Sequence, residues 1–367
     1  MRTDKKKFST RLMTALMAGT LAVGMLGMSV FADTADQEET TVTNLPEVTI
    51  TKDVITDGYT YAPKTSFSFT VSVAGDGQYD GNKVKAGKEG GLYFSKEDET
   101  KNYTGSISFV PSGSTPTAKY TDTIKLKTDV SVFDEAGIYH YTLSETDSRY
   151  SGITYDTAAR DVYVYVYEKN NERYIGNVIT SYTHTDKNGK KEVVKNGPFI
   201  NDYGANNDTT HDITVTKQVN GNMGEHNKLF KFKVSINGDD GEWYKVLVKE
   251  AEGSAVKEYH IISGAHADYF IKDTGFIQIF GLTSNDTYKV EEENYEADGY
   301  KTKVGDEETR TVEGEVTADG TQVTVTNTKT VPSPTGIVLN YGPYILMIAL
   351  AGSMAVFFLR KKNRKEA

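Results

Sequence analysis

Four strand-like segments occur twice in this chain, in the same order, and this repetition constrains the fold more than any other feature of the sequence. In each segment apolar and polar residues alternate, as they do in a β-strand with one buried face. The pairs are 48–54 with 213–219, 67–73 with 230–236, 139–147 with 286–294, and 199–202 with 325–328. Four matches in one order are not expected by chance, so the sequence predicts two copies of a single β module.

The composition and the turns favour an all-β protein made of two tandem Ig-like β-sandwich domains. Tyr accounts for 24 of the 367 residues, and helix-type apolar periodicity is scarce. Gly- and Asn-rich turns separate the short predicted strands, which is typical of sandwiches. The polar stretch at 202–212 (DYGANNDTTHD) predicts a joint between the modules. We therefore place the first domain at 38–204 and the second at 211–330.

The N-terminal segment, residues 1–32, has the pattern of a secretory signal peptide. A start rich in Lys and Arg precedes a mostly apolar stretch, and the small residue Ala32 offers a cleavage point. A membrane span is the alternative interpretation, and the charged start followed by VFA argues against it. The sequence thus predicts export from the cell.

The C-terminus predicts attachment to the cell wall through three consecutive parts. VPSPTG at 331–336 is followed by an uncharged, mostly apolar run at 337–359, long enough to cross a hydrocarbon core of about 30 Å, and by a basic tail at 360–367. A plain membrane anchor is one interpretation. The order of the parts also resembles a sortase sorting signal, whose pattern is Leu-Pro-x-Thr-Gly. That resemblance implies cleavage between Thr335 and Gly336 and transfer of the Thr335 carbonyl to an amine.

Charge and cysteine content exclude several classes of function. The whole chain has a formal net charge of −10, and removal of 1–32 and 336–367 leaves 31 Lys/Arg against 49 Asp/Glu, a charge of −18. This charge disfavours nucleic acid or anionic lipid as a partner, so membrane contact is expected only through the C-terminal span before sorting. The chain has no cysteine, so any covalent cross-link in this exported protein must be something other than a disulfide bond.

Each module places one Lys, one Glu and one Asn on the apolar face of a predicted strand. The assignment follows from parity, because side chains alternate between the two faces of a strand. The triads are Lys52, Glu145 and Asn201 in the first module, and Lys217, Glu292 and Asn327 in the second. Burying such groups without partners is unfavourable. A buried Lys–Glu ion pair with a hydrogen-bonded Asn is one interpretation, and solvated strand ends are another.

The recurrence of the triad favours a third interpretation, which is intramolecular amide formation. Burial lowers the pKa of a lysine and raises that of a glutamate, because both charged forms lose hydration. A neutral Lys Nζ is a nucleophile for the Asn side-chain carbonyl, and a protonated Glu can polarise that carbonyl and shuttle protons. Ammonia leaves and a Lys–Asn isopeptide bond remains. The reaction occurs once per site without turnover, so we do not expect the protein to be an enzyme.

These motifs together resemble the major (backbone) pilins of Gram-positive sortase-assembled pili that contain two pilin isopeptide-linkage domains. The most specific stretches are TITK, YTLSETDSRYSGITYD and PFIND in the first module, and TVTK, YKVEEENYEADGY and VTNT in the second. The resemblance extends over almost the whole chain. It implies two assisted bonds, Lys52–Asn201 with Glu145, and Lys217–Asn327 with Glu292.

The same resemblance implies that a lysine near the last strand of the first domain receives Thr335 of the next subunit. The lysines available there are Lys187, Lys190, Lys191 and Lys195. Lys195 lies closest to Asn201, at about the spacing found in the family, so it is the expected intersubunit link. An ordinary solvated lysine is the alternative. The implied partners are sortase, neighbouring copies of the chain, peptidoglycan and minor tip or base pilins.

The expected function is that of a structural shaft subunit in a covalently polymerised, cell-wall-anchored pilus at the cell surface. A monomeric wall-anchored adhesin that binds host protein or glycan is the alternative, and it would share the sorting signal and the internal bonds. No cofactor or metal is expected. The loop at 76–81 (DGQYDG) resembles a calcium loop only loosely, since Gly87 stands where the bidentate Glu belongs. The sequence contains no constellation typical of a hydrolase.

Overall fold

The computed structural model describes residues 45, 47–95, 100–185, 188–316, 320–331, 344 and 346–351. The predicted signal peptide and the predicted cleavage site, Thr335 and Gly336, lie outside these residues and stay predictions. Of the predicted apolar span, only residues 344 and 346–351 are described, and they are helical. Among the described residues, no helix has the length and apolar character needed to cross a membrane.

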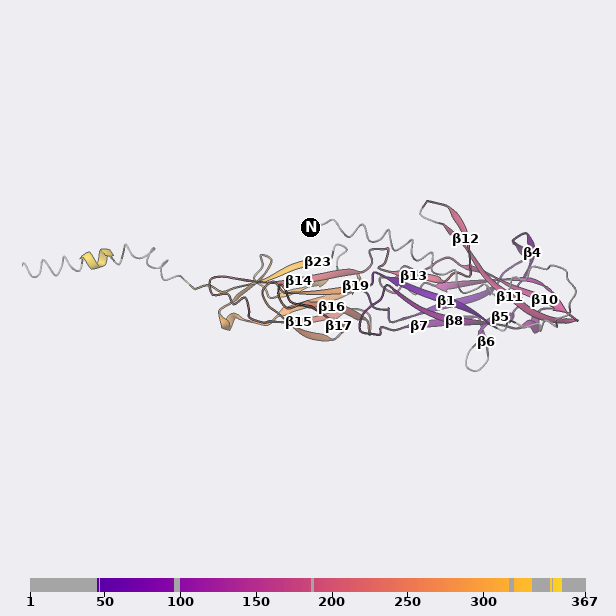
Figure 1. The fold of residues 1–367 in the computed structure, drawn as a ribbon, viewed down its shortest axis with the longest axis horizontal. Coiled ribbons are helices and arrows are strands. Elements are labelled where there is room, and N and C mark those ends of the chain that lie inside the picture. Colours follow the sequence, from indigo (N-terminus) through magenta and orange to yellow (C-terminus); the bar gives the residue numbers. More distant parts are fainter. Residues whose placement is uncertain are drawn as a thin grey trace, which may run out of the picture.

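The molecule is elongated, and two β-sandwiches follow one another along its long axis (Figure 1). In the first sandwich one sheet has the strand order β13-β1-β8-β5-β6, and the other has the order β12-β11-β10-β9-β2-β7, with β4 joined to β9 and β3 to β4. Its elements are β1 (Glu47–Thr56), β2 (Thr65–Val73), β3 (Gly77–Tyr79), β4 (Asn82–Ala86), β5 (Leu92–Ser95), β6 (Lys101–Asn102), β7 (Thr104–Phe109), β8 (Lys119–Thr128), the 3-10 turn η2 (Val130–Val132), β9 (Gly137–Thr146), β10 (Arg160–Lys169), β11 (Glu172–Thr185), β12 (Lys191–Lys195) and β13 (Phe199–Tyr203).

The second sandwich repeats this plan on a smaller scale. Its sheets have the strand orders β17-β16-β19-β14-β23-β21 and β18-β15-β20-β22. Its elements are β14 (His211–Asn220), β15 (Phe230–Asn237), β16 (Trp243–Lys249), β17 (Val256–Ile262), β18 (His266–Ile271), β19 (Phe276–Leu282), β20 (Thr287–Glu292), the 3-10 turn η3 (Glu296–Asp298), β21 (Lys301–Val304), β22 (Thr311–Glu315) and β23 (Thr321–Thr328). The predicted all-β architecture of tandem Ig-like sandwiches is confirmed.

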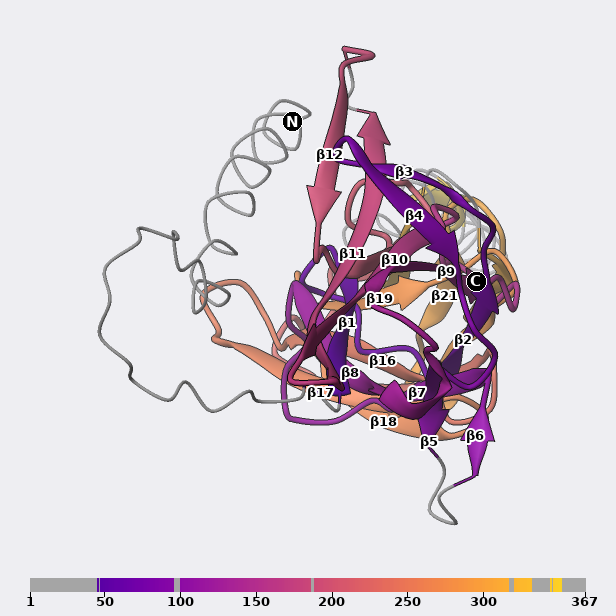
Figure 2. The same ribbon diagram turned by 90° about the vertical axis from the view of Figure 1, so that its right-hand side faces the viewer.

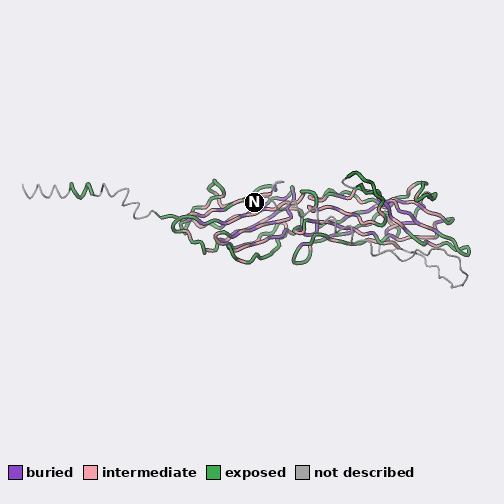
Figure 3. The backbone as a smooth tube through the Cα atoms, turned by 45° about the horizontal axis from the view of Figure 1, so that its top comes forward, coloured by how far each residue is buried: buried purple, intermediate pink, exposed green. Residues whose placement is uncertain are grey.

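Alternation along the strands produces a separate apolar core in each sandwich (Figure 3). In β2 the side chains of Phe67, Phe69 and Val71 are buried, whereas the neighbouring Ser66 and Ser68, on the other face, are exposed. Full burial of one such apolar side chain contributes roughly 1.5–3 kcal/mol to stability. The apolar face of each strand therefore fixes its register, because a shift of one residue would expose that face to water.

The first and last strands of each sandwich are parallel neighbours, although most of the module separates them in sequence. In the first sandwich β1 pairs with β13, with Lys52 opposite Phe199 and Val54 opposite Asn201. In the second sandwich β14 pairs with β23, with Lys217 opposite Val325 and Val219 opposite Asn327. In both cases the lysine and the asparagine face the same side of the sheet, two residues out of register.

The loop between β1 and β2 makes part of the contact between the sandwiches. The ring of Tyr59 stacks on Phe280 with 4.8 Å between the ring centroids, and Tyr61 packs edge-on against Trp243. Farther along the chain, the Tyr150 hydroxyl donates a hydrogen bond of 2.6 Å to the buried carboxyl of Glu242. These aromatic and polar contacts join the two sandwiches end to end.

Candidate functional site

The lysine of the first triad is completely buried in the core of the first sandwich. Lys52 lies in the middle of β1, where the alternating pattern directs it inward, and none of its surface is exposed. Its Nζ lies 2.8 Å from Oε2 of Glu145 and 4.7 Å from the centroid of the Phe67 ring. Desolvation lowers the pKa of Lys52 to about 8, although the nearby Glu145 carboxylate opposes this effect.

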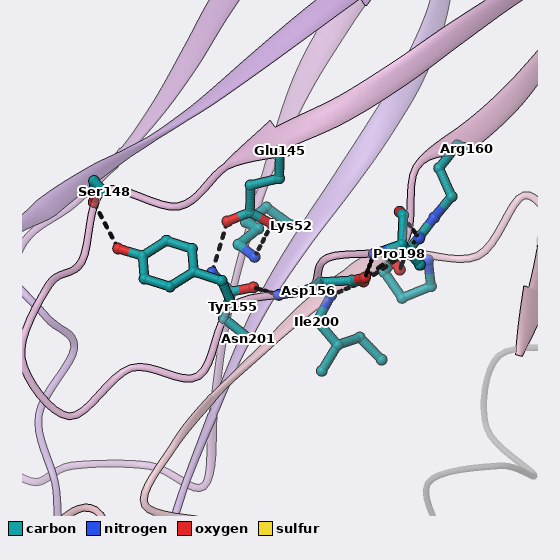
Figure 4. A network of polar contacts seen from close by, with 10 residues as sticks. Lys52, Glu145, Ser148, Tyr155, Asp156, Arg160, Pro198, Ile200 and Asn201 are labelled. Atoms are coloured by element: carbon teal, nitrogen blue, oxygen red, sulfur yellow. Dashed lines mark hydrogen bonds and ion pairs between the residues drawn. The ribbon is translucent and has the colours of Figure 1, made fainter. Parts of the chain in front are cut away.

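The same carboxyl group also contacts the asparagine of the triad (Figure 4). Asn201, on β13, is fully buried, and its Nδ2 donates a hydrogen bond of 2.6 Å to Oε1 of Glu145, on β9. The Glu145 side chain is itself without exposed surface, and burial raises its pKa. The structure therefore brings the three predicted residues together, with the amine and the carboxamide on the two oxygens of one carboxyl group.

The carbonyl oxygen of Asn201 has a different partner from the one that the sequence suggested. We expected Glu145 to polarise this carbonyl, but Glu145 contacts the amide nitrogen instead. Oδ1 of Asn201 accepts a hydrogen bond of 2.8 Å from the backbone N–H of Asp156. In a carbonyl addition the oxygen becomes negative, so a fixed N–H at this position stabilises the addition product.

A buried arginine next to this site was missed in the sequence. Arg160 begins β10 and is only 1% exposed. Its Nη2 donates to Oδ2 of Asp156 at 2.6 Å and to the carbonyl of Pro198 at 2.9 Å. A signal was present, since Arg160 shares its parity with Val162, Val164 and Val166 on the buried face of its strand. It is the same signal that identified the two lysines.

The second sandwich contains a matching triad of buried side chains. The Nζ of Lys217 lies 3.2 Å from Oε1 of Glu292, and Nδ2 of Asn327 donates to the same oxygen at 3.1 Å. Burial lowers the pKa of Lys217 to about 8 and raises that of Glu292. Parity selected Glu292 over its neighbours, and Glu292 is fully buried whereas Glu291 pairs with Arg310.

The second triad differs from the first in its hydrogen bonds. Lys217 Nζ also donates to the carbonyls of Gln218 and Val325, at 3.3 and 3.2 Å. The Thr302 hydroxyl donates to Oε2 of Glu292 at 3.3 Å, so this oxygen has a partner from outside the triad. Oδ1 of Asn327 is buried, and no hydrogen-bond donor reaches it from the described part of the chain. Among the described residues, the second site thus has no counterpart of the Asp156 N–H.

The predicted intersubunit lysine lies on the surface, as a residue that receives another chain must. Lys195 ends β12, in a hairpin with β11 that projects from the body of the first sandwich (Figure 2). Its side chain is 46% exposed, and its Nζ pairs with Oδ2 of Asp80 at 2.8 Å. This ion pair raises the pKa of Lys195. Of its neighbours, Lys190 pairs with Glu192, Lys191 is exposed, and Lys187 lies outside the described residues.

Comparison with known proteins links most of the chain to pilins. A curated protein named Pilin, from Streptococcus pyogenes serotype M1, is 26% identical over 360 residues, which is 91% of this chain and 95% of that protein. Residues 211–329 match a family described only as a domain of unknown function (DUF7601). The resemblance to backbone pilins that the motifs indicated is therefore confirmed.

Solved structures show the same fold. The major pilin from Streptococcus pyogenes aligns with a TM-score of 0.55 at 20% identity, over 79% of this chain and all of that one. A glutamate-to-alanine variant of that pilin aligns with a TM-score of 0.53, and an asparagine-to-alanine variant with 0.52, each over 78% of this chain at 20% identity. This chain therefore shares its fold with that major pilin.

Proposed function

We propose that this chain is the shaft subunit of a covalently polymerised, cell-wall-anchored pilus, and that one Lys–Asn isopeptide bond closes each of its two domains. The pairs are Lys52 with Asn201 and Lys217 with Asn327. One observation carries the proposal: a fully buried amine and a fully buried carboxamide contact a single buried carboxyl group, and this arrangement occurs twice at the same offset between the first and last strands.

The geometry supports a balanced reaction at the first site. The lone pair of neutral Lys52 Nζ attacks Cγ of Asn201, and the electron pair of the C=O double bond moves to Oδ1. Nζ loses a proton to the Glu145 oxygen beside it, while Nδ2 gains the proton that Glu145 held. The Cγ–Nδ2 bond then breaks, ammonia leaves, and the carbonyl forms again as a secondary amide. No other reactant is consumed.

Burial shifts the pKa values of Lys52 and Glu145 in the directions that the reaction needs. A pKa of about 8 leaves roughly a tenth of Lys52 neutral at pH 7, whereas an ordinary lysine is neutral in fewer than about one molecule in a thousand. The raised pKa of Glu145 favours the protonated form that can serve the leaving nitrogen. Folding fixes the three groups next to one another, and such proximity replaces a large part of the entropic barrier to reaction.

A buried ion pair is the competing explanation of the same geometry. It accounts for Lys52 and Glu145, because a buried charge needs a partner. It gives no reason for an asparagine to meet the same carboxyl group in both sandwiches. Intact mass separates the two explanations, because each bond removes one ammonia, about 17 Da by the stoichiometry of the reaction above. A folded chain with no such loss would refute the bonds.

The shaft role requires a link between subunits as well. Sortase would cleave after Thr335 and transfer its carbonyl to an amine of the next subunit, for which the exposed Lys195 is our candidate. The last subunit would join peptidoglycan, and minor pilins would occupy the tip or base. Cell-wall extract boiled in detergent should then show a ladder of multiples of one subunit. A single band at subunit mass would favour the monomeric adhesin instead.

A further inference from the structure

We propose that the backbone N–H of Asp156, held in place by the side chain of Arg160, activates the Asn201 carbonyl, and that the first isopeptide bond therefore forms faster than the second. The inference rests on the bond formation proposed above. It assigns a catalytic role to one backbone group outside the triad and a positioning role to Arg160 (Figure 4).

The Asp156 N–H lies where the reaction develops negative charge. When Lys52 Nζ bonds to Cγ, the electron pair of the C=O double bond moves to Oδ1, and Asp156 N–H already donates to that atom at 2.8 Å. Asn201 is fully buried, so water does not compete for the oxygen or screen the interaction. The electron pair returns to the carbonyl when the Cγ–Nδ2 bond breaks and ammonia leaves. The N–H transfers no proton in either step.

The segment that carries this N–H is tied to β13 at several points. The Asp156 carboxylate accepts hydrogen bonds from the N–H of Ile200 at 3.2 Å and from the N–H of Ala158 at 3.0 Å. Two residues earlier, Thr154 and Asp202 exchange both of their backbone hydrogen bonds, at 2.8 and 3.0 Å. Donor and acceptor thus belong to one hydrogen-bonded unit, which limits the reorganisation needed during reaction.

Arg160 makes further hydrogen bonds to this hydrogen-bonded unit. Its guanidinium bonds both the Asp156 carboxylate and the carbonyl of Pro198, which precedes β13. The guanidinium also lies 3.6 Å from the Tyr182 ring centroid and 4.1 Å from that of Phe199, with the two aromatic rings holding it in the core. Burying a guanidinium is costly without partners, and both terminal nitrogens of Arg160 have them, whereas its Nε has none among the described residues. The partners of the guanidinium here are the groups that orient the donor toward Asn201.

The second site offers a comparison within the same molecule. Oδ1 of Asn327 is buried and receives no hydrogen bond from any described residue. The two sites share the triad, the burial and the offset between strands, and they also differ in the hydrogen bonds from Lys217 to two backbone carbonyls and from Thr302 to Glu292. Loss of one donor to a developing oxyanion costs on the order of 10²–10³ in rate. We therefore expect the first bond to form on the order of 10²-fold faster than the second.

The experiment follows each bond separately in the full chain. A Lys217→Ala chain can form only the first bond, and a Lys52→Ala chain can form only the second. A short pulse of cell-free synthesis is stopped by an antibiotic, samples are quenched in denaturant over time, and the loss of about 17 Da is followed by intact mass. The Lys217→Ala chain, which can form only the first bond, is then combined with Arg160→Leu, Asp156→Ala or Asp156→Asn.

Arg160→Leu and Asp156→Ala should each slow the first bond by about tenfold or more, because both release the segment that holds the donor. Asp156→Asn should slow the first bond less than Asp156→Ala does, because its single amide oxygen can still accept a hydrogen bond from either Ala158 or Ile200, whose N–H groups contact different oxygens of the carboxylate. A merely structural role would not predict this rescue. Circular dichroism confirms that each variant is folded.

Two results would overturn the inference while leaving the proposed function intact. The first is that the Lys217→Ala and Lys52→Ala chains lose about 17 Da at the same rate, or that the Lys52→Ala chain loses it faster. The second is that folded Arg160→Leu and Asp156→Ala chains react at the parental rate. If neither background ever loses ammonia, the proposed function itself fails and the inference fails with it.

Discussion

Replacing Lys52 by Met tests how much the first bond stabilises its domain, with little disturbance of packing. Met has an unbranched side chain of similar reach and adapts to irregular core spaces. The substitution removes the amine, so no bond to Asn201 can form. It also removes the buried positive charge, so Glu145 can remain protonated against Asn201 Nδ2. The measured change should therefore come mainly from the missing bond.

The expected magnitude follows from the length of chain that the bond encloses. The loop from Lys52 to Asn201 contains about 150 residues, and closing a loop of that length removes unfolded-chain entropy worth about 5 kcal/mol at 25 °C in the chain-entropy model. One kcal/mol shifts the Tm of a domain of this size by about 2–4 °C. Lys52→Met should thus lower the Tm of the first domain by about 10–20 °C.

Differential scanning calorimetry and a double-mutant cycle provide the measurement. Asn201→Ala also prevents the bond, so adding Lys52→Met to it should cost little further stability, and the coupling between the two changes should approach about 5 kcal/mol. Lys217→Met is the matched control, because it should destabilise the second domain and leave the first transition in place. A Lys52→Met domain that melts within about 2 °C of the parent would refute the bond as a source of stability.

Three further predictions follow from the same contacts. Glu145→Ala should prevent proton transfer at the first site, so intact mass should show one ammonia retained and partial proteolysis should cut the first domain sooner, whereas the second domain should be unchanged. Bond formation at Lys52 should have an optimum in pH, because it needs both the neutral amine of Lys52, whose pKa burial has lowered from 10.5 to about 8, and the proton held by Glu145, whose pKa burial raises. Acidification should slow the reaction by protonating Lys52, and alkalinisation should slow it by deprotonating Glu145; timed mass measurements in a pH series check this. Lys195→Ala should abolish the ladder of subunit multiples in boiled cell-wall extracts while the domains remain folded, whereas Lys191→Ala, which removes an exposed lysine of the same hairpin, should leave the ladder intact.

Parity in the sequence placed the three polar residues of each triad on buried faces, and the resemblance to pilins paired them. Lys52 and Asn201 lie on strands that are distant in the chain, yet each occupies a position where the pattern requires an apolar residue. Burying a polar group there is tolerated only when partners exist, so the pattern implied that the buried polar groups converge. The choice of Glu292 over its neighbours followed from the same argument, and its burial agrees with it.

The surroundings of each triad could not be predicted in this way. The contact between Asp156 N–H and Asn201 involves a backbone group in a segment without regular structure, and side-chain parity gives no information about such groups. Arg160 carried a parity signal, but without the fold nothing indicated that its partner would be Asp156. The packing of Tyr59 on Phe280 depends on how the two sandwiches meet, which local patterns do not determine.

The short connection between the sandwiches sets how far such a subunit could lengthen under tension. With both bonds formed and Thr335 of another subunit joined to Lys195, tension runs along residues 195–217, across the Lys217–Asn327 bond and along residues 327–335, and the rest of the two loops bears none. Within that path, the stretch between Asn201 and Lys217 connects the two sandwiches. The ends of that stretch are already extended in β13 and β14, and residues 204–210 could supply at most about 25 Å. This segment is also restrained, because the Asp202 carboxylate accepts hydrogen bonds from the N–H groups of Ala205 and Asn206 at 2.9 and 3.0 Å. A fibre of these subunits would therefore lengthen very little under tension.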